Sequence, residues 1–388
     1  MSAFGMRINI GILRKVRVHR SQRQPIRRRF VAALIVISIL GVMAPASILA
    51  QDGDPLRPQQ WGHVQLRLDE AYDTSTGEGV VIAILDSGID LDHPDLVDKL
   101  VPGWDFIEND DQPQDENGHG THVAGIAAAT ANNGIGVAGA APDARIMPVR
   151  VMNGLGIGDP EVIALAITWA ADNGADIINL SLGGNTDLLS RIFKNGPMNL
   201  SIVDAYNKGV VVIAAAGNDD TFIQAYHDGV PVLVVNASNE GGVPAQFSNW
   251  GDPRAVTAPG TRILSTAPIE PSWIWKSGSD GYEELDGTSM AAPYVAGVAA
   301  LLVDTHRGDD PSTIFEILVE TSVNSNGDPR LGAGIVDAEA AVVRSDRNLW
   351  LIGLAGVLIV AAIVAIVWSL VRRRHGRRPP PTMVGTAA

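Results

Sequence analysis

The 388-residue chain contains no cysteine. Disulfide bonds, zinc sites built on thiolates and a cysteine nucleophile are therefore excluded together. The chain also lacks any long low-complexity tract, and 46% of its residues are hydrophobic against 19% charged. This composition is typical of a globular chain and not of a disordered one. Without disulfides, the stability of the fold must come from packing or from a bound ion.

Acidic residues are absent from both ends of the chain. Residues 1–29 hold nine lysines and arginines, and residues 372–378 hold five arginines. All 43 Asp and Glu lie between Asp52 and Asp346 beside only 15 Lys and Arg, so the middle of the chain carries a formal charge of −28. A body of that sign repels phosphate backbones, which excludes nucleic acid as an expected partner.

The basic N-terminal end adjoins a run without charges. Residues 30–50 are uncharged, follow three arginines and contain two small-residue sites suited to cleavage. Residues 1–50 are therefore interpreted as a basic n-region and a secretory signal peptide. An uncleaved N-terminal anchor is the alternative, because the run is nearly long enough to cross a membrane.

A second uncharged run, residues 349–371, lies near the C-terminus. As a helix it would be about 35 Å long, enough to span roughly 30 Å of hydrocarbon. Trp350 and Trp368 lie near its ends, and the basic tail 372–388 follows. A buried core helix is the alternative, but tryptophans at both ends and a following basic cluster favour a transmembrane helix in contact with the lipid bilayer.

Positive charge stays on the cytoplasmic side of a membrane, so the tail is expected to be cytoplasmic. The sequence therefore predicts a cell-membrane protein, single-pass or double-pass. Its acidic domain, residues 51–342, would lie outside the cytoplasm, and residues 343–348 would be the juxtamembrane linker.

The body alternates short β-branched runs with longer helical segments. Continuous apolar runs, typical of strands buried on both faces, occupy 80–85, 144–152, 175–182, 210–216 and 232–237. Helices are expected at 119–130, 160–172 and 199–208. This order predicts an α/β fold of three layers, with a mostly parallel central sheet and helices on both faces. Ligands bind at the carboxyl ends of such strands, so the chemistry should follow these runs.

Three residues capable of chemistry follow strands or open helices. Asp86 comes directly after the first strand in LDSGID, His119 stands between two glycines in ENGHGTHVAG, and Ser289 lies in DGTSMAAPYVAG at the start of a long apolar helix. Taken singly, they would more often be a loop cap, a structural histidine and a helix cap. Together they supply a nucleophile, a base to take its proton and an acid to orient that base.

These segments carry a family resemblance. LDSGID, GHGTHVAG and GTSMAAP resemble, in order and spacing, the three signature segments of the subtilisin-like serine proteases, the subtilase family, over roughly residues 54–342. The resemblance implies a subtilisin-like fold and a serine endopeptidase that hydrolyses polypeptide substrates with Asp86, His119 and Ser289 as its triad. It also implies that Asn218, in AAAGND, donates to the oxyanion, although an Asn after a Gly is ordinarily a turn residue.

The same resemblance implies two edges that hold an extended peptide by main-chain bonds. One edge is Ser181, Leu182 and Gly183 in SLGG. The opposing edge contains Gly154 and Gly156 in NGLGIG.

The chain resembles most the thermitase-like branch of this family, which implies structural Ca²⁺ and no catalytic cofactor. A first site would take side-chain oxygens from Asp54, Asp95 and Asn133 and carbonyl oxygens from Thr130, Ile135 and Val137. A second would use Asp105, Asp110 and Gln114. Calcium prefers six to eight oxygen ligands. A hydrated acidic loop is the alternative at each place. A zinc site does not compete, because HGTH lacks the HExxH spacing.

Some residues depart from the family pattern or stay outside the proposed chemistry. Tyr294 occupies a place where a histidine is usual, and residues 219–232 differ from the usual wall of the primary specificity pocket. His93 and His122 are expected to be structural.

Two other functions remain open at this point. A catalytically silent protein of this fold could bind peptides or act as a scaffold at the membrane. A different serine hydrolase, such as an esterase, is the other alternative, but its GxSxG elbow is absent.

Overall fold

The computed structural model describes residues 53–182, 196–223, 226 and 229–344, together with Val360, Ala362, Ile363, Ala365 and Ile366. The chain divides into two units, Met1–Gln51 and Asp52–Ala388. All that follows concerns the second unit. The predicted signal peptide or anchor at 1–50 and the tail at 372–388 lie outside the described residues, as does most of the predicted membrane helix.

Seven strands form one sheet in the order β2-β3-β1-β4-β5-β6-β7, and every neighbouring pair is parallel. The strands are β1 (Val81–Asp86), β2 (Trp104–Asp105), β3 (Arg145–Arg150), β4 (Ile177–Leu180), β5 (Val211–Ala215), β6 (Leu233–Ser238) and β7 (Val256–Pro259). The five predicted strands are confirmed, and they are buried along almost their whole length.

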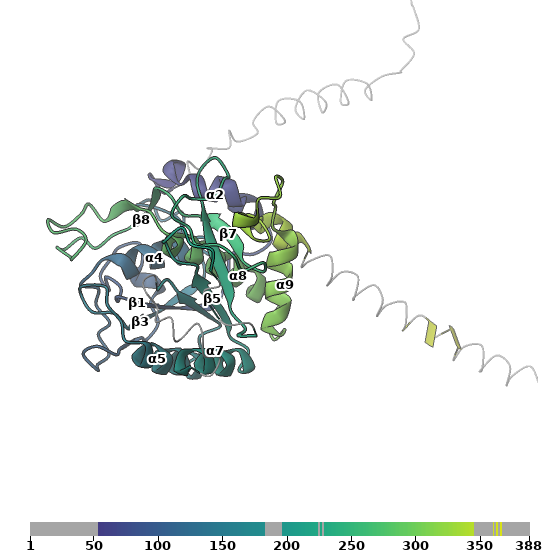
Figure 1. Cartoon of the computed structure of the whole chain (residues 1–388), viewed down its shortest axis with the longest axis horizontal. Helices are drawn as coiled ribbons and strands as arrows, with labels where there is room; N and C mark the ends of the chain where they lie inside the picture. Colours follow the sequence, from purple (N-terminus) through teal and green to yellow (C-terminus); the bar gives the residue numbers. More distant parts are fainter. Residues whose placement is uncertain are drawn as a thin grey trace, which may run out of the picture. The chain divides into compact units, whose positions relative to one another are not determined.

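Helices cover both faces of this sheet, as predicted (Figure 1). Helices α5 (Pro160–Asp172) and α7 (Pro197–Asn207) lie side by side on one face, and α4 (His119–Ala128) and α8 (Thr288–Thr305) pack on the other. Successive residues of a strand point to opposite faces. In β1, Ile82 therefore joins the core beneath α4 and α8, whereas Leu85 joins the core beneath α5 and α7.

Local chemistry explains where α5 and one further helix begin. The Asp159 carboxylate accepts a hydrogen bond of 2.8 Å from the backbone N–H of Glu161, and Pro160 occupies the first turn of α5. Helix α9 (Pro311–Thr321) repeats this arrangement with Asp310 as its cap. The remaining helices that the described ranges contain are short: η1 (Arg57–Gln59), α2 (Trp61–Leu66), α3 (Leu68–Ala71), η2 (Val97–Lys99) and η3 (Pro329–Leu331).

A separate antiparallel hairpin, β8 (Ile263–Thr266) and β9 (Tyr282–Leu285), packs against α4. The residues between its strands extend well beyond a tight turn and return to the start of α4. There, the backbone N–H of Trp273 donates to the Glu116 carbonyl at 3.0 Å, and that of Ile274 donates to the Asn117 carbonyl at 2.9 Å. This hairpin was not predicted.

Among the described residues, α8 is the one helix long and apolar enough to cross a bilayer, and most of it is buried in the core. Of the run 349–371, the described residues Val360, Ala362, Ile363, Ala365 and Ile366 are helical and exposed. The C-terminal membrane helix therefore remains a prediction.

Candidate active site

The carboxyl ends of β1, β4 and β5 and the first turns of α4 and α8 meet around one cavity. Asp86 is the last residue of β1, His119 the first of α4 and Ser289 the second of α8. The cavity has a volume of about 290 Å³, and its lining includes His119, Ser289, Asn218 and Ser181. The fold therefore brings together side chains that are widely separated in the sequence.

A buried carboxylate orients the imidazole. Asp86 Oδ1 lies 2.7 Å from Nδ1 of His119, and the Asp86 side chain is fully buried whereas that of His119 is 21% exposed. The backbone N–H of Ser87 donates to the same oxygen at 2.8 Å. Because an ionised carboxylate can only accept, Nδ1 carries the proton and Nε2 is left free to take one.

The charge around His119 favours its protonated form. Burial lowers the pKa of this imidazole, but the negative charge and hydrogen bond of Asp86, with the charge of Asp115, outweigh burial and raise the pKa above its ordinary value. The site therefore stabilises the imidazolium that a general base becomes when it accepts a proton.

Asp115 was not singled out from the sequence, although it lies four residues before His119. Its buried carboxylate accepts five hydrogen bonds, from the Ser87 hydroxyl, the Thr121 hydroxyl and the backbone N–H groups of Asn117, Gly118 and Thr121. Burial raises its pKa, and these donors oppose the shift. Asp115 thereby fixes the first turn of α4, which carries His119, beside β1.

The glycines on either side of His119 allow other parts of the protein, and not only the substrate, to pack closely against the start of α4. A Cβ at Gly118, whose φ is +109°, would lie 2.7 Å from the Trp275 ring. A Cβ at Gly120 would collide with the Gly88 carbonyl oxygen. Larger residues would therefore push α4 away from β1 and from the hairpin.

Ser289 is held at the start of α8 by Ser181. Its hydroxyl donates to the Ser181 carbonyl at 3.2 Å, while the Ser181 hydroxyl donates to the Ser289 carbonyl at 2.8 Å. Thus, among the described hydrogen bonds, the Ser289 hydroxyl bonds main chain rather than His119. Nucleophile–base hydrogen bonds are often loose before substrate binds, and both side chains line the same cavity.

Asn218 is oriented by Thr288, which the sequence analysis did not single out although it directly precedes Ser289. Asn218 Oδ1 accepts from the backbone N–H of Thr288 at 2.9 Å and from its hydroxyl at 3.0 Å. The hydroxyl in turn accepts from the backbone N–H of Gly217 at 3.0 Å. With Oδ1 occupied, the side-chain NH₂ of Asn218 is available to the cavity.

The predicted substrate edges lie beside this cavity as far as they are described. Ser181 and Gly156 line it. Gly154 lines an adjoining pocket, and Leu182 packs partly buried against the α5–α7 core. Gly183 lies outside the described residues.

The first predicted calcium group surrounds the loop 130–137. The side chains of Asp54 and Asp95 are buried, and no lysine or arginine in the described part of the chain pairs with either. Asp54 accepts from the backbone N–H groups of Asn132 and Asn133, and Asp95 accepts from the Asn133 amide and the Val137 N–H. Thr130 donates its N–H to the Asp95 carbonyl, and the Ile135 N–H donates to Asn133. Two buried carboxylates without a cation fit a bound Ca²⁺.

The second predicted group is occupied by protein contacts. Asp105 pairs with Arg150 at 3.0 Å and accepts from the backbone N–H groups of Ile107 and Glu108. Asp110 accepts from the Gln112 N–H, and Gln114 accepts from the Leu91 N–H. Because Arg150 already neutralises Asp105, this group fits a cation less well than the first group.

The other histidines have structural contacts. His93 bonds the Gly281 carbonyl at 2.8 Å and accepts from the Asp95 N–H, and His122 bonds the Glu283 carbonyl at 3.0 Å. Burial lowers the pKa of His122 to about 3. Tyr294 is buried and packs edge-on against His63, in the core. In residues 219–232, which differ from the usual wall of the primary specificity pocket, Phe222 is exposed and packs on Trp250.

Comparison with known proteins gives consistent matches. The model of the Subtilase family matches residues 77–337. Thermitase of Thermoactinomyces vulgaris is 41% identical over 288 residues, covering 73% of this chain and 96% of its own length. Subtilisin Savinase of Lederbergia lenta is 36% identical, covering 72% of this chain and 97% of its own length. Among solved structures, a protease of Pseudoalteromonas arctica PAMC 21717 superposes with a TM-score of 0.67 at 36% identity, covering 76% of this chain and 99% of that one.

Proposed function

Because the chain belongs to the subtilase family of serine endopeptidases, we propose that Asp86, His119 and Ser289 perform its peptide hydrolysis. The observation that carries this assignment is the 2.7 Å bond from a buried carboxylate to His119 Nδ1, in a cavity that Ser289 also lines. It leaves Nε2 free to act as the base.

In the first half of the reaction, Ser289 Oγ attacks the scissile carbonyl carbon while Nε2 of His119 takes the hydroxyl proton. The carbonyl oxygen becomes an oxyanion, which accepts hydrogen bonds from the Asn218 NH₂ and from the backbone N–H of Ser289. The N-terminal end of α8 adds a favourable dipole. Nε2 then protonates the leaving amine, and an acyl group remains on Ser289.

In the second half, water replaces the amine. Nε2 takes a proton from the water as its oxygen attacks the acyl carbon, and the same donors hold the new oxyanion. Collapse of this intermediate releases the acid product and returns the proton to Ser289 Oγ. The polypeptide substrate would lie extended between the 181–183 edge and the 154–156 edge, bonded main chain to main chain.

Steady-state hydrolysis of a peptide by the purified protein tests the assignment. Asp86→Asn, His119→Ala and Ser289→Ala are each expected to reduce kcat severely, because the three groups act as a unit. Lys208→Gln, on the far end of α7, is the control and should retain activity. If the wild type binds peptide but never cleaves it, and the Ser289→Ala protein binds peptide equally well, the result would instead favour a silent peptide-binding scaffold.

Calcium at the Asp54–Asp95 site is part of the proposal. The ion would neutralise two buried carboxylates and tie the N-terminal segment to the loop 130–137 in a chain without disulfides. At a free Ca²⁺ concentration 100 times Kd, the gain in unfolding free energy is about 2.7 kcal/mol. We therefore expect EDTA to lower Tm and the double variant Asp54→Asn/Asp95→Asn to abolish that response. If EDTA lowers the Tm of this variant as much as that of the wild type, the ion binds at another site, and Asp105, Asp110 and Gln114 are the remaining candidates.

Attachment to the cell membrane through 349–371 is also proposed, with the peptidase domain outside the cytoplasm and the tail inside. The support is the length of the uncharged run and the basic residues that follow it. The full-length chain should fractionate with membranes and resist extraction by carbonate, whereas a chain ending at residue 344 should not. A truncated chain that stays in the membrane would instead indicate an uncleaved N-terminal anchor.

A further inference from the structure

The long β8–β9 connection adds a wall to the substrate side of the molecule. Its residues 271–276, here called the 271–276 loop, bond the backbone of Glu116 and Asn117 through Trp273 and Ile274. The Asn117 amide in turn donates to the Gly154 carbonyl at 3.0 Å. The loop, the segment before His119 and the 154–156 edge are thus joined in series by hydrogen bonds.

The loop is anchored on one side and open on the other. Trp275 turns inward, where its ring stacks on His122 with centroids 6.4 Å apart. Ile274 lines the same cavity as His119 and Ser289. Trp273 is 51% exposed, so a large aromatic face is presented to solvent beside the catalytic cavity.

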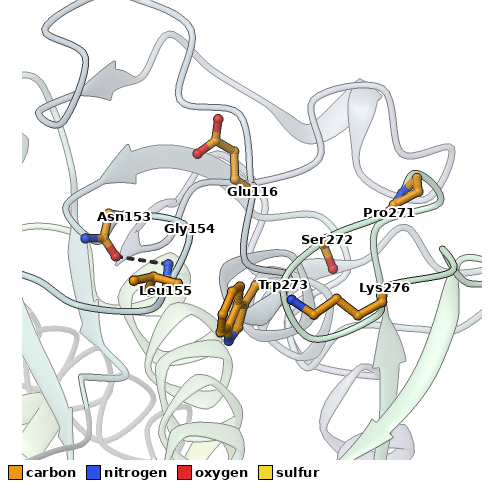
Figure 2. Close-up of a pocket in the computed structure, with 8 residues that line it drawn as sticks. All are labelled: Glu116, Asn153, Gly154, Leu155, Pro271, Ser272, Trp273 and Lys276. Atoms are coloured by element: carbon orange, nitrogen blue, oxygen red, sulfur yellow. Dashed lines mark hydrogen bonds between the residues drawn. The ribbon is translucent and has the colours of Figure 1, made fainter.

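A second pocket of about 470 Å³ lies between the loop and residues 153–155, which overlap the 154–156 edge (Figure 2). It shares Leu155 with the catalytic cavity. An extended peptide along the 154–156 edge would therefore place one side chain in this pocket when its scissile bond is at Ser289. We call this space the rim pocket.

The rim pocket contains an uncommitted cation. Lys276 Nζ lies 3.4 Å from the centroid of the Trp273 ring. Figure 2 shows the two side chains next to each other. Lys276 has no ion pair or hydrogen bond with any residue in the described part of the chain. Every other lysine or arginine among the described residues pairs with a carboxylate or donates to a carbonyl oxygen. The ring contact holds the ammonium in place and leaves its remaining directions open to a ligand.

The other charge in the rim pocket, Glu116, is 61% exposed and shares the Arg150 guanidinium with Asp105. Glu116 lies on a different side of the pocket from Lys276 (Figure 2), and its carboxylate bonds Arg150 at 2.6 Å. The acidic body repels anions at long range, but charges beyond about 8 Å are largely screened at physiological salt. Lys276 is therefore the positive charge that a substrate side chain meets on the Trp273 side of the pocket.

We infer that Lys276, positioned by Trp273, makes the rim pocket a subsite for a carboxylate-bearing side chain of the substrate, a glutamate or an aspartate. This inference rests on the proposed peptide hydrolysis and adds a preference for an acidic residue near the scissile bond. The contact is solvent-exposed, so its effect on kcat/KM is modest, about two- to fivefold.

A positional peptide series provides the test. Peptides with one cleavable bond carry Glu, Gln or Lys in turn at each of the three residues on either side, and kcat/KM is measured with the full-length protein. At one position, Glu should exceed Gln by about two- to fivefold at low salt, and the ratio should fall toward one in 1 M NaCl. Lys276→Gln should abolish the ratio, Lys276→Glu should invert it in favour of Lys, and Lys276→Arg should keep it. Lys208→Gln is the matched control and should leave the ratio unchanged.

The result against the inference is a Glu/Gln ratio of one at every position, or a ratio that survives in Lys276→Gln. A preference for Lys that disappears in Glu116→Gln would assign the pocket to Glu116 instead. Binding of the same peptides to the Ser289→Ala protein gives a second readout that needs no turnover. Equal Kd values for Glu and Gln peptides there contradict the subsite even if hydrolysis fails, whereas loss of hydrolysis with a persistent Glu preference contradicts only the proposed reaction.

Discussion

His119 is influenced by two carboxylates that differ in what they do. Asp86 bonds the imidazole directly, whereas Asp115 acts on its charge from a place where five donors hold it. Both favour the imidazolium, and together they outweigh the burial that lowers the pKa of His119. Under the proposed reaction, the neutral imidazole that would accept the Ser289 proton therefore predominates only at a higher pH than for an ordinary histidine.

We expect kcat/KM to rise with pH along an acid limb whose apparent pKa lies above the ordinary histidine value. Asp115→Asn removes one negative charge, so it should move that limb to lower pH, in addition to any loss from disturbed packing. The measurement is the pH profile of kcat/KM for both proteins. An unshifted limb in Asp115→Asn would limit Asp115 to holding α4.

Substitutions at Asn218 and Thr288 should reduce oxyanion stabilisation to different degrees. Asn218→Ala should lower kcat by about 10²–10³-fold with little change in KM, the loss known for such donors in this family. Thr288→Val removes the hydroxyl that orients Asn218 and should lower kcat by a smaller factor. A rise in KM at constant kcat in either variant would indicate a role in ground-state binding instead.

Elements that start with local chemistry could be predicted from the sequence. Helix α5 was predicted with its observed bounds, because Asp159-Pro160 is both a cap and a start signal. Strand β2 was missed because two residues, Trp104 and Asp105, carry no periodicity. The 271–276 loop was missed for another reason. Its hydrogen bonds to Glu116 and Asn117 join backbone atoms far apart in the sequence, and backbone groups are the same in every residue type, so the sequence gives no sign of them.

The same distinction applies to the candidate site. Asp86, His119 and Ser289 lie in recognisable segments at strand or helix ends, and the fold brings them together. Asp115 and Thr288 neighbour those residues in sequence, so the signal was present but their hydrogen bonds could not be read from it. Lys276 could not have been found, since its contact with the Trp273 ring and its lack of an oxygen partner among the described residues are properties of the folded chain.

The cap of α5 gives a test at the scale of an element. Asp159→Ala removes the acceptor for the Glu161 N–H and should cost about 1 kcal/mol of unfolding free energy. Asp172→Ala, at the other end of the same helix, removes an exposed pair with Lys208 and should change the free energy by less. Chemical denaturation measures both, and equal losses would show that the cap itself contributes little.

At the scale of the whole molecule, buried neutral histidines limit acid stability. His63 is fully buried. Burial lowers the pKa of His63, as it does for His93 and His122. Below a pH of about 6.5 the unfolded chain binds protons at these histidines while the folded chain does not, so stability falls as the pH falls.

Replacing His63 with leucine should relieve part of this loss. Each such histidine contributes a slope of about 1.4 kcal/mol per pH unit below its unfolded pKa and above its folded pKa. His63→Leu should therefore gain unfolding free energy relative to the wild type at pH 5 beyond any difference seen at pH 8. A difference that is the same at both pH values would show that His63 does not titrate on unfolding.

The central claim is that Ser289 is the nucleophile and that His119 activates it. The direct measurement is mass spectrometry of the protein after reaction with a fluorophosphonate, which labels activated serine hydroxyls. One adduct per chain is expected, on the peptide containing Ser289, with labelling lost in Ser289→Ala and strongly slowed in His119→Ala. An adduct on another serine, or equal labelling of the His119→Ala protein, would contradict the account.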